Sequence, residues 1–104
     1  MIRWSDKLYK GKGVPPLHEV NWNIRHNAGM AEIYYIVLSQ RKDELLEIYP
    51  SYVMMQPHLK EKDFYAVGIA RGYTYALKLT RDIIDDVYQS TGTFDVEELF
   101  KEDT

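Results

Sequence analysis

A strand that runs directly into a long amphipathic helix restricts the fold of this chain more than any other feature. Residues 64–70 read Phe-Tyr-Ala-Val-Gly-Ile-Ala, and this density of β-branched and aromatic side chains is typical of a buried strand. Gly72 can then turn the chain, and apolar residues recur at helical spacing from about residue 73 or 74 to residue 91. Gly92 supplies a natural C-terminal stop. The sequence therefore predicts a strand–turn–helix unit.

Side chains of this strand are expected to alternate between two faces, one of which is small enough for a helix to approach closely. The first face would carry Tyr65, Val67 and Ile69, and the second Phe64, Ala66, Gly68 and Ala70. The helix is expected to bury a stripe of Ala76, Leu79, Thr80, Ile83, Val87 and Tyr88, with Leu77 and Ile84 beside it.

Shorter elements precede this unit. Residues 31–39 are dense in apolar β-formers on both alternating faces, which predicts a central strand. Residues 16–28 follow a helical pattern, and so do residues 43–49, which Pro50 ends.

The remaining segments are less regular. Residues 2–9 predict a short strand or a hairpin, and residues 51–63 a connection with an irregular turn or a short edge strand. Residues 95–98 have capping-box spacing, so Leu99 and Phe100 could dock a last short helix.

These elements predict a single small α/β or α+β domain spanning residues 1–104, because a chain of 104 residues has no room for a second core. The expected sheet has about three strands, mixed or parallel, with about three helices and a short C-terminal helical segment. The connection over residues 40–63 is long enough for a right-handed crossover and contains a predicted helix, which favours a parallel pair. An α+β sheet with helices on one face is the alternative.

Composition excludes several classes of site. The chain has no cysteine, so it has no disulfide framework, thiolate metal site or cysteine nucleophile. The start of the chain lacks an apolar signal core, and no stretch approaches the ~20 apolar residues of a membrane span. We therefore expect a cytoplasmic protein with no membrane partner.

The first candidate site is the turn from strand to helix, with Arg71, Gly72 and Thr74 as anion-site residues. Small residues let a ligand approach, free N–H groups at a helix start favour anions, and an arginine can fork onto a phosphate or carboxylate. Neither the dinucleotide nor the P-loop glycine motif is present, however. A tight turn that needs Gly72 for its backbone angle is the explanation we favour.

The second candidate is the basic, aromatic N-terminal third, because cations interleaved with aromatic rings suit single-stranded nucleic acid. Its residues are Arg3, Trp4, Lys7, Tyr9, Lys10, Lys12, Trp22, Arg25 and His26. Their spacing matches no nucleic-acid motif, and the whole chain is acidic with a net charge of −3. We favour tryptophans in the core or an interface and lysines that keep the surface soluble.

Other polar residues give no catalytic or metal-binding pattern. His18, His26 and His58 include no pair four residues apart, and Asp82, Asp85 and Asp86 have no loop that could wrap an ion. His26 is expected to interact with the C-terminal end of its helix. No hydrolase turn surrounds Ser5, Ser39, Ser51 or Ser90. We therefore expect no cofactor and no metal, and no motif supports an enzyme.

Three blocks together resemble a family of small bacterial proteins of the Firmicutes type. They are Trp4-Ser5-Asp6-Lys7-Leu8-Tyr9, His26-Asn27-Ala28-Gly29-Met30, and Val67-Gly68-Ile69-Ala70 followed by an amphipathic helix. The resemblance covers most of the chain and implies a bacterial, cytoplasmic, single-domain protein. It brings no activity, cofactor or catalytic residue.

The leading hypothesis is a non-enzymatic interaction or regulatory domain that self-associates, as a homodimer. Nine tyrosines and two tryptophans against three phenylalanines favour half-buried contact surfaces, and a chain this short gains stability from an oligomer. The alternative is a small-ligand or anion-binding protein, with or without enzymatic activity, that uses the turn at Arg71–Thr74. Single-stranded nucleic-acid binding is third.

Overall fold

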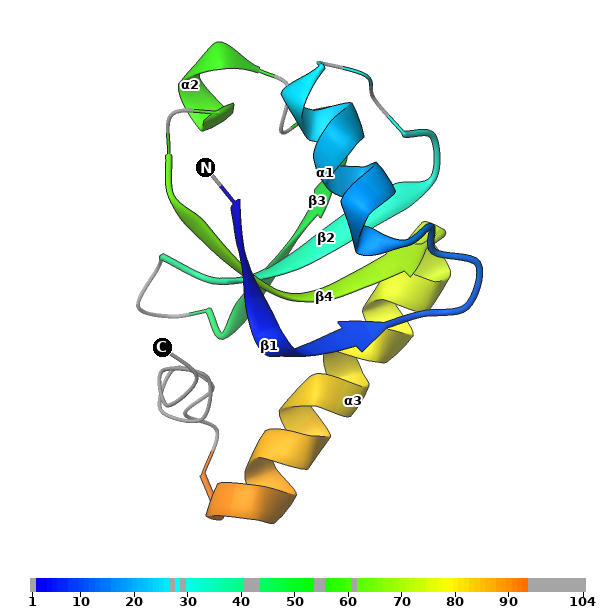
Figure 1. Cartoon of the computed structure of the whole chain (residues 1–104). Coiled ribbons are helices and arrows are strands. Elements are labelled where there is room, and N and C mark those ends of the chain that lie inside the picture. The colour runs from blue at the N-terminus through cyan, green and yellow to red at the C-terminus, as the bar shows by residue number, and fades with distance from the viewer. Residues whose placement is uncertain are drawn as a thin grey trace.

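A four-stranded mixed sheet lies between two helices (Figure 1). The computed structural model describes residues 2–26, 28, 30–40, 44–53, 56–60 and 62–93. In chain order its elements are β1 (Ile2–Lys10), α1 (Leu17–Arg25), β2 (Ile33–Leu38), β3 (Leu46–Pro50), α2 (Pro57–Lys60), β4 (Phe64–Arg71) and α3 (Tyr73–Thr91).

The strands lie in the order β1-β4-β2-β3. The β1 and β4 strands are parallel, whereas β4 pairs antiparallel with β2 and β2 antiparallel with β3. Figure 1 shows α1 on one side of the sheet and α3 on the other. The protein is thus a small single domain of the α+β class. This matches the alternative arrangement predicted from the sequence, except that the helices cover both faces of the sheet.

Each face of the sheet has its own apolar core. On the α1 side, Val20 packs against buried side chains of β2 and β4, and Trp4 contacts Tyr35 edge-on with ring centroids 5.7 Å apart. On the α3 side, Ile36, Val67, Ile83 and Val87 form a second buried cluster. Two thin cores therefore replace the single deep core of a larger domain.

A bulge in β4 overturns the expected alternation of its side chains. Opposite β4, Ile36 pairs with Gly68 but the next residue, Val37, pairs with Ala66, so Val67 is an extra residue. Beyond it the faces exchange: Ile69 joins the α1 core, whereas Gly68 faces Ile36 and Ile83 on the α3 side. Strict alternation was the wrong prediction here, since a bulge shifts the period of a strand by one residue.

The clearest error of the sequence-based prediction concerns residues 43–49. A helix was expected, but residues 46–50 form β3, which pairs with β2 from Leu38↔Leu46 to Tyr34↔Pro50. This hairpin removes the need for a crossover, so the prediction of a parallel pair between the strands of residues 31–39 and 64–70 is also wrong: β2 and β4 are antiparallel.

Most other elements match the expectation. The helix predicted for residues 16–28 covers Leu17–Arg25, with Pro16 at its N-cap, and the strand predicted for residues 31–39 is β2. The N-terminal segment is a strand, and the connection before β4 holds the short α2. Residues 95–100, expected to end in a helix, lie outside the described residues.

The long helix also begins and ends as predicted. Gly72 (φ 93°) precedes α3, and Gly92 (φ 76°) caps it in the left-handed conformation, donating its N–H to the Tyr88 carbonyl. Ala76, Ile83 and Val87 are buried as expected. Tyr88, which was expected in the buried stripe, is 45% exposed.

Candidate functional site

An exposed apolar surface lies where α3 faces β3. We call it the α3–β3 surface, and its residues are Tyr73, Leu77, Ile84, Tyr88, Leu46 and Ile48. Within it, Tyr73, Leu77 and Tyr88 are 54%, 47% and 45% exposed, values unusual for large apolar side chains that share a face.

Helix geometry gathers the α3 members of this surface into one stripe. Their spacing of four, seven and four residues keeps them on one side of the helix. The other side of α3 faces β1, because the Tyr9 hydroxyl donates to Asp86 at 2.8 Å. The stripe itself lies toward β2 and β3, since Tyr73 contacts Tyr34 edge-on at 5.6 Å between ring centroids.

The β3 strand completes the surface. A shallow hollow of about 410 Å³ between β3 and α3 is lined in part by Leu46, Ile48 and Tyr73. Both β3 side chains are half-buried and contact the α3 core. Among the described residues β3 ends the sheet, so an apolar stripe and an open strand edge lie side by side.

The other edge strand, β1, is less suited to contact. Its register against β4 jumps from Trp4↔Ala66 to Tyr9↔Gly68, which makes a wide bulge, and its exposed positions include Arg3, Asp6, Lys7 and Lys10. Bulges and charges at an edge oppose pairing with another strand. The open edge of β3 carries one charged side chain, Glu47.

The turn predicted as an anion site is bonded to two other connections of the chain. Arg71 Nη1 donates to the Gly13 carbonyl at 3.2 Å, and Arg71 Nε lies 3.6 Å from Glu32 Oε2. The Gly72 N–H donates to the Glu32 carbonyl at 2.6 Å. Arg71 therefore holds the β1–α1 and α1–β2 connections against the β4–α3 turn.

A hollow of about 450 Å³ does lie at this turn. Its lining residues are Lys12, Gly13, Glu32, Arg71, Gly72 and Tyr75; Thr74, the third predicted residue, is exposed and does not line it. Lys12 adds a second cation, whereas Glu32 places a carboxylate beside Arg71. An incoming anion would have to compete with that carboxylate for the guanidinium.

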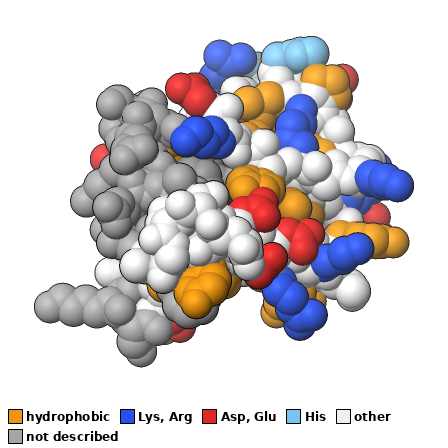
Figure 2. Space-filling model, turned by 90° about the horizontal axis from the view of Figure 1, so that it is seen from below, with side chains coloured by type: hydrophobic (Ala, Val, Ile, Leu, Met, Phe, Trp, Pro, Cys, Tyr) orange, Lys and Arg blue, Asp and Glu red, His pale blue; other side chains and the backbone are white. Residues whose placement is uncertain are grey.

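The basic, aromatic N-terminal residues do not form one surface. Trp4 is half-buried in the α1 core, where its Nε1–H donates to Asn21 Oδ1 at 2.8 Å, so it offers no ring to a base. Arg3 stacks over Tyr65, which belongs to the α3 side. On the face shown in Figure 2, basic side chains are mixed with acidic and hydrophobic ones.

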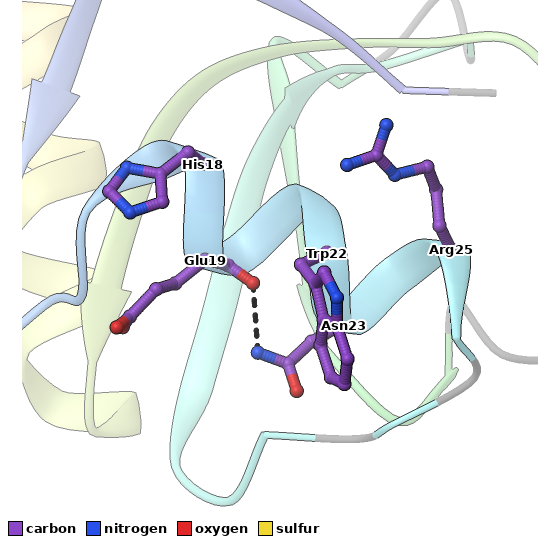
Figure 3. A pocket seen from close by; sticks show the side chains of 5 residues that line it. All are labelled: His18, Glu19, Trp22, Asn23 and Arg25. Carbon is purple, nitrogen blue, oxygen red and sulfur yellow. Dashed lines mark hydrogen bonds between the residues drawn. The ribbon is translucent and has the colours of Figure 1, made fainter.

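Trp22 and Arg25 lie apart from these residues, on the outer side of α1 (Figure 3). With His18, Glu19 and Asn23 they line an open hollow of about 510 Å³ built from one helix. The Trp22 ring stacks on His26, with centroids 4.1 Å apart, and His26 Nδ1 lies 2.8 Å from the Trp22 carbonyl. His26 thus ends its helix as predicted, and it covers one face of the exposed indole.

The remaining polar candidates form no catalytic or metal-binding group among the described residues. Ser5 accepts a hydrogen bond from the Lys7 N–H, Ser39 donates to Glu47, and Ser51 bridges the backbone of Met30. Within the described part of the chain, no three His, Asp or Glu side chains are grouped to hold a metal ion. No helix there is long and apolar enough to span a membrane.

Comparison with protein-family models, with curated proteins and with solved structures finds no match. The resemblance to bacterial proteins of the Firmicutes type stays a prediction. The function is therefore inferred from the geometry of the described residues.

Sequence reasoning missed the α3–β3 surface as a site. Its signal was present, because Leu77 and Ile84 were placed beside the buried stripe of the helix. The expected helix over residues 43–49 concealed the strand that completes the surface.

Proposed function

We propose that this protein is a non-enzymatic interaction domain of the cytoplasm that forms a homodimer through its α3–β3 surface. One observation carries the proposal: Tyr73, Leu77 and Tyr88 are about half exposed in one stripe beside the open edge of β3. Contiguous apolar surface on a small domain marks an interaction site, and half-exposed tyrosines are common in such interfaces.

Size supports a second copy as the partner. A chain of 104 residues with two thin cores gains stability when apolar surface is buried between copies. A standard interface removes roughly 800 Å² from each partner. Three half-exposed side chains supply only part of that area, so β3 would have to contribute as well.

Light scattering of the purified protein at high micromolar concentration tests the proposal. The expected result is a dimer, and a strict monomer would overturn it. Leu77→Glu places a charge in the stripe and should weaken the dimer at least tenfold. The matched control is Tyr75→Glu, because Tyr75 is 67% exposed on another side of the same helix and should leave the dimer intact.

Anion binding at the Arg71 turn is the rival function. The presence of Lys12 and Arg71 in one hollow supports it, and the pairing of Arg71 with Glu32 and Gly13 weighs against it. A thermal-shift titration with inorganic phosphate tests it. A shift that Arg71→Ala abolishes would favour this rival, and the absence of a shift across a wide anion panel would remove it.

Single-stranded nucleic-acid binding has the least support, since the described N-terminal cations and tryptophans point to separate surfaces. An absent or salt-independent gel shift with oligonucleotides would remove it.

A further inference from the structure

The backbone of β3 determines what its open edge can bind. In an antiparallel pair, opposite residues alternate between those that exchange hydrogen bonds and those that do not. The Ser39 N–H donates to the Leu45 carbonyl at 3.2 Å, and the Ser51 N–H donates to the Ile33 carbonyl at 2.8 Å. These two bonds flank the β2–β3 pairing. They fix its phase, that is, which residues of β3 direct their backbone groups toward β2 and which direct them outward.

It follows that Glu47 and Tyr49 direct their backbone groups toward β2, opposite Val37 and Tyr35. Leu46, Ile48 and Pro50 direct theirs outward. The open edge therefore offers two N–H groups and three carbonyls, because proline has no N–H. A proline whose missing N–H faces away from the sheet is typical of an edge strand.

From this phase we infer that two copies of the chain pair their β3 strands antiparallel, with the two-fold axis at Ile48, to form one continuous eight-stranded sheet. The inference rests on the proposed homodimer and specifies its geometry. In this register the two Ile48 residues exchange two hydrogen bonds. Each Leu46 N–H also donates to the Pro50 carbonyl of the second copy, which gives four bonds.

Other symmetric registers are poorer. An axis at Glu47 places two carboxylates directly opposite each other, and like charges in that position destabilise a sheet. An axis at Tyr49 needs the N–H of Pro50 for both bonds that flank it, and that group does not exist. An axis at Leu46 would set Ile48 opposite Glu44, which lies outside β3. Pro50, Glu47 and the start of β3 at Leu46 together thus select Ile48.

The side chains agree with the selected register. Glu47 lies opposite Tyr49 of the second copy, and within one chain the Tyr49 hydroxyl already donates to the Glu47 carboxylate. On the α3 side, Ile48 lies beside Ile48 of the second copy, so the two α3–β3 surfaces become continuous. An unrelated peptide would meet the same backbone groups but has no such reason to match this pattern, which favours a second copy.

Cysteine cross-linking tests the register, because the natural chain has no cysteine. Opposite Cβ atoms of a hydrogen-bonded pair lie about 5.5 Å apart, beyond the ~3.5–4.5 Å of an unstrained disulfide, so a short bifunctional thiol reagent is the suitable cross-linker. Ile48→Cys should therefore give a covalent dimer with this reagent. Leu46→Cys is the matched control on the same face, since its two copies lie four residues out of register, on the order of 13 Å apart.

Three outcomes are decisive. Cross-linking of Ile48→Cys alone supports the inference. Equal cross-linking of both variants, or none of Ile48→Cys while wild-type light scattering shows a dimer, overturns the register and leaves the proposed function standing. A wild-type monomer overturns both.

A backbone test avoids the side chain. Ile48→Pro removes an outward N–H but no bond to β2, whereas Ile48→Ala loses a comparable side chain and keeps the N–H. The proline variant should be monomeric and the alanine variant dimeric, and two dimers would overturn the inference. If the proline variant does not fold, amide exchange in the wild type decides: the Leu46 and Ile48 amides should gain protection as protein concentration rises, and free exchange in the dimer would contradict the pairing.

Discussion

The Tyr9 hydroxyl donates a hydrogen bond of 2.8 Å to the Asp86 carboxylate and so ties the edge strand β1 to α3. Partial burial, followed by this hydrogen bond and the charges of Asp86 and Asp82, raises the pKa of Tyr9 to about 12. The bond holds the side of α3 that faces away from β3. It thereby fixes which side of the helix presents the apolar stripe.

We predict that Tyr9→Phe lowers the free energy of unfolding by about 0.5–1 kcal/mol at neutral pH, the range of a partly exposed hydrogen bond. Because the folded pKa of Tyr9 lies above its ordinary value of 10, this contribution is fully present below pH 10 and is lost as the pH rises toward about 12. Urea unfolding of both proteins across this range checks the prediction.

The stability of Tyr9→Phe has to be compared with that of the wild type at each pH, because burial also raises the pKa of Tyr35 to about 12. Both proteins therefore lose stability in alkali through Tyr35, and the difference between them isolates Tyr9. A difference that stays constant from pH 9 to about pH 12 would contradict the assigned role.

Gly68 is expected to tolerate no side chain without cost. A Cβ built there would lie 3.0 Å from Ile36 Cδ1 and 3.1 Å from Ile83 Cδ1, so both core side chains would have to move. Gly68→Ala should lower the free energy of unfolding by about 1–3 kcal/mol through overpacking. Denaturant titration measures this, and an unchanged midpoint would show that the α3 core is looser than described.

Gly92→Ala provides the contrast, because a Cβ at Gly92 would meet no atom within 4 Å and only its φ of 76° is unfavourable. Its cost is that of the left-handed conformation, about 1 kcal/mol.

Ser51 is predicted to be a structural residue rather than a nucleophile. It is 1% exposed, its hydroxyl donates to the Met30 carbonyl, and it accepts a bond of 3.1 Å from the Met30 N–H. Ser51→Ala leaves both backbone groups without this partner and should cost about 2 kcal/mol. The exposed Ser90→Ala is the control and should lie within about 0.5 kcal/mol of the wild type. Equal thermal stability of the two variants would refute this role.

The local sequence pattern was sufficient to predict a long element. It was insufficient for a short segment whose secondary structure depends on pairing with another strand. Nineteen residues of helical spacing make α3 unambiguous. Over residues 43–49, Leu45, Leu46 and Tyr49 suit a helix, whereas Leu46 and Ile48 alternate with Glu47 as in a strand. Seven residues cannot separate the helical from the strand period. The strand forms because it pairs with β2, a contact that no local pattern contains.

The same limit applied to the site and to the bulge. Leu77 and Ile84 were visible beside the buried stripe of the helix, but the strand β3 that lies beside them was not predicted. The extra residue Val67 arises from the register against β2, and the only sign of a bulge in the sequence of β4 is the neighbouring Gly68. Arg71 and Gly72 were recognised as neighbours in a turn; their contacts with Gly13 and Glu32 join segments far apart in the chain.

Dimer formation should also make thermal stability depend on protein concentration, because a second copy binds only the folded chain. When the dimer predominates, each tenfold increase in concentration adds half of 1.4 kcal/mol per chain, about 0.7 kcal/mol, which raises the Tm by roughly 3–5 °C for a domain of this size. Leu77→Glu should lose this dependence, and Tyr75→Glu should keep it. Scanning calorimetry over a hundredfold concentration range measures the effect. A wild-type Tm that does not change over this range would contradict a dimer stabilised by the α3–β3 surface, whatever the register of its β3 strands.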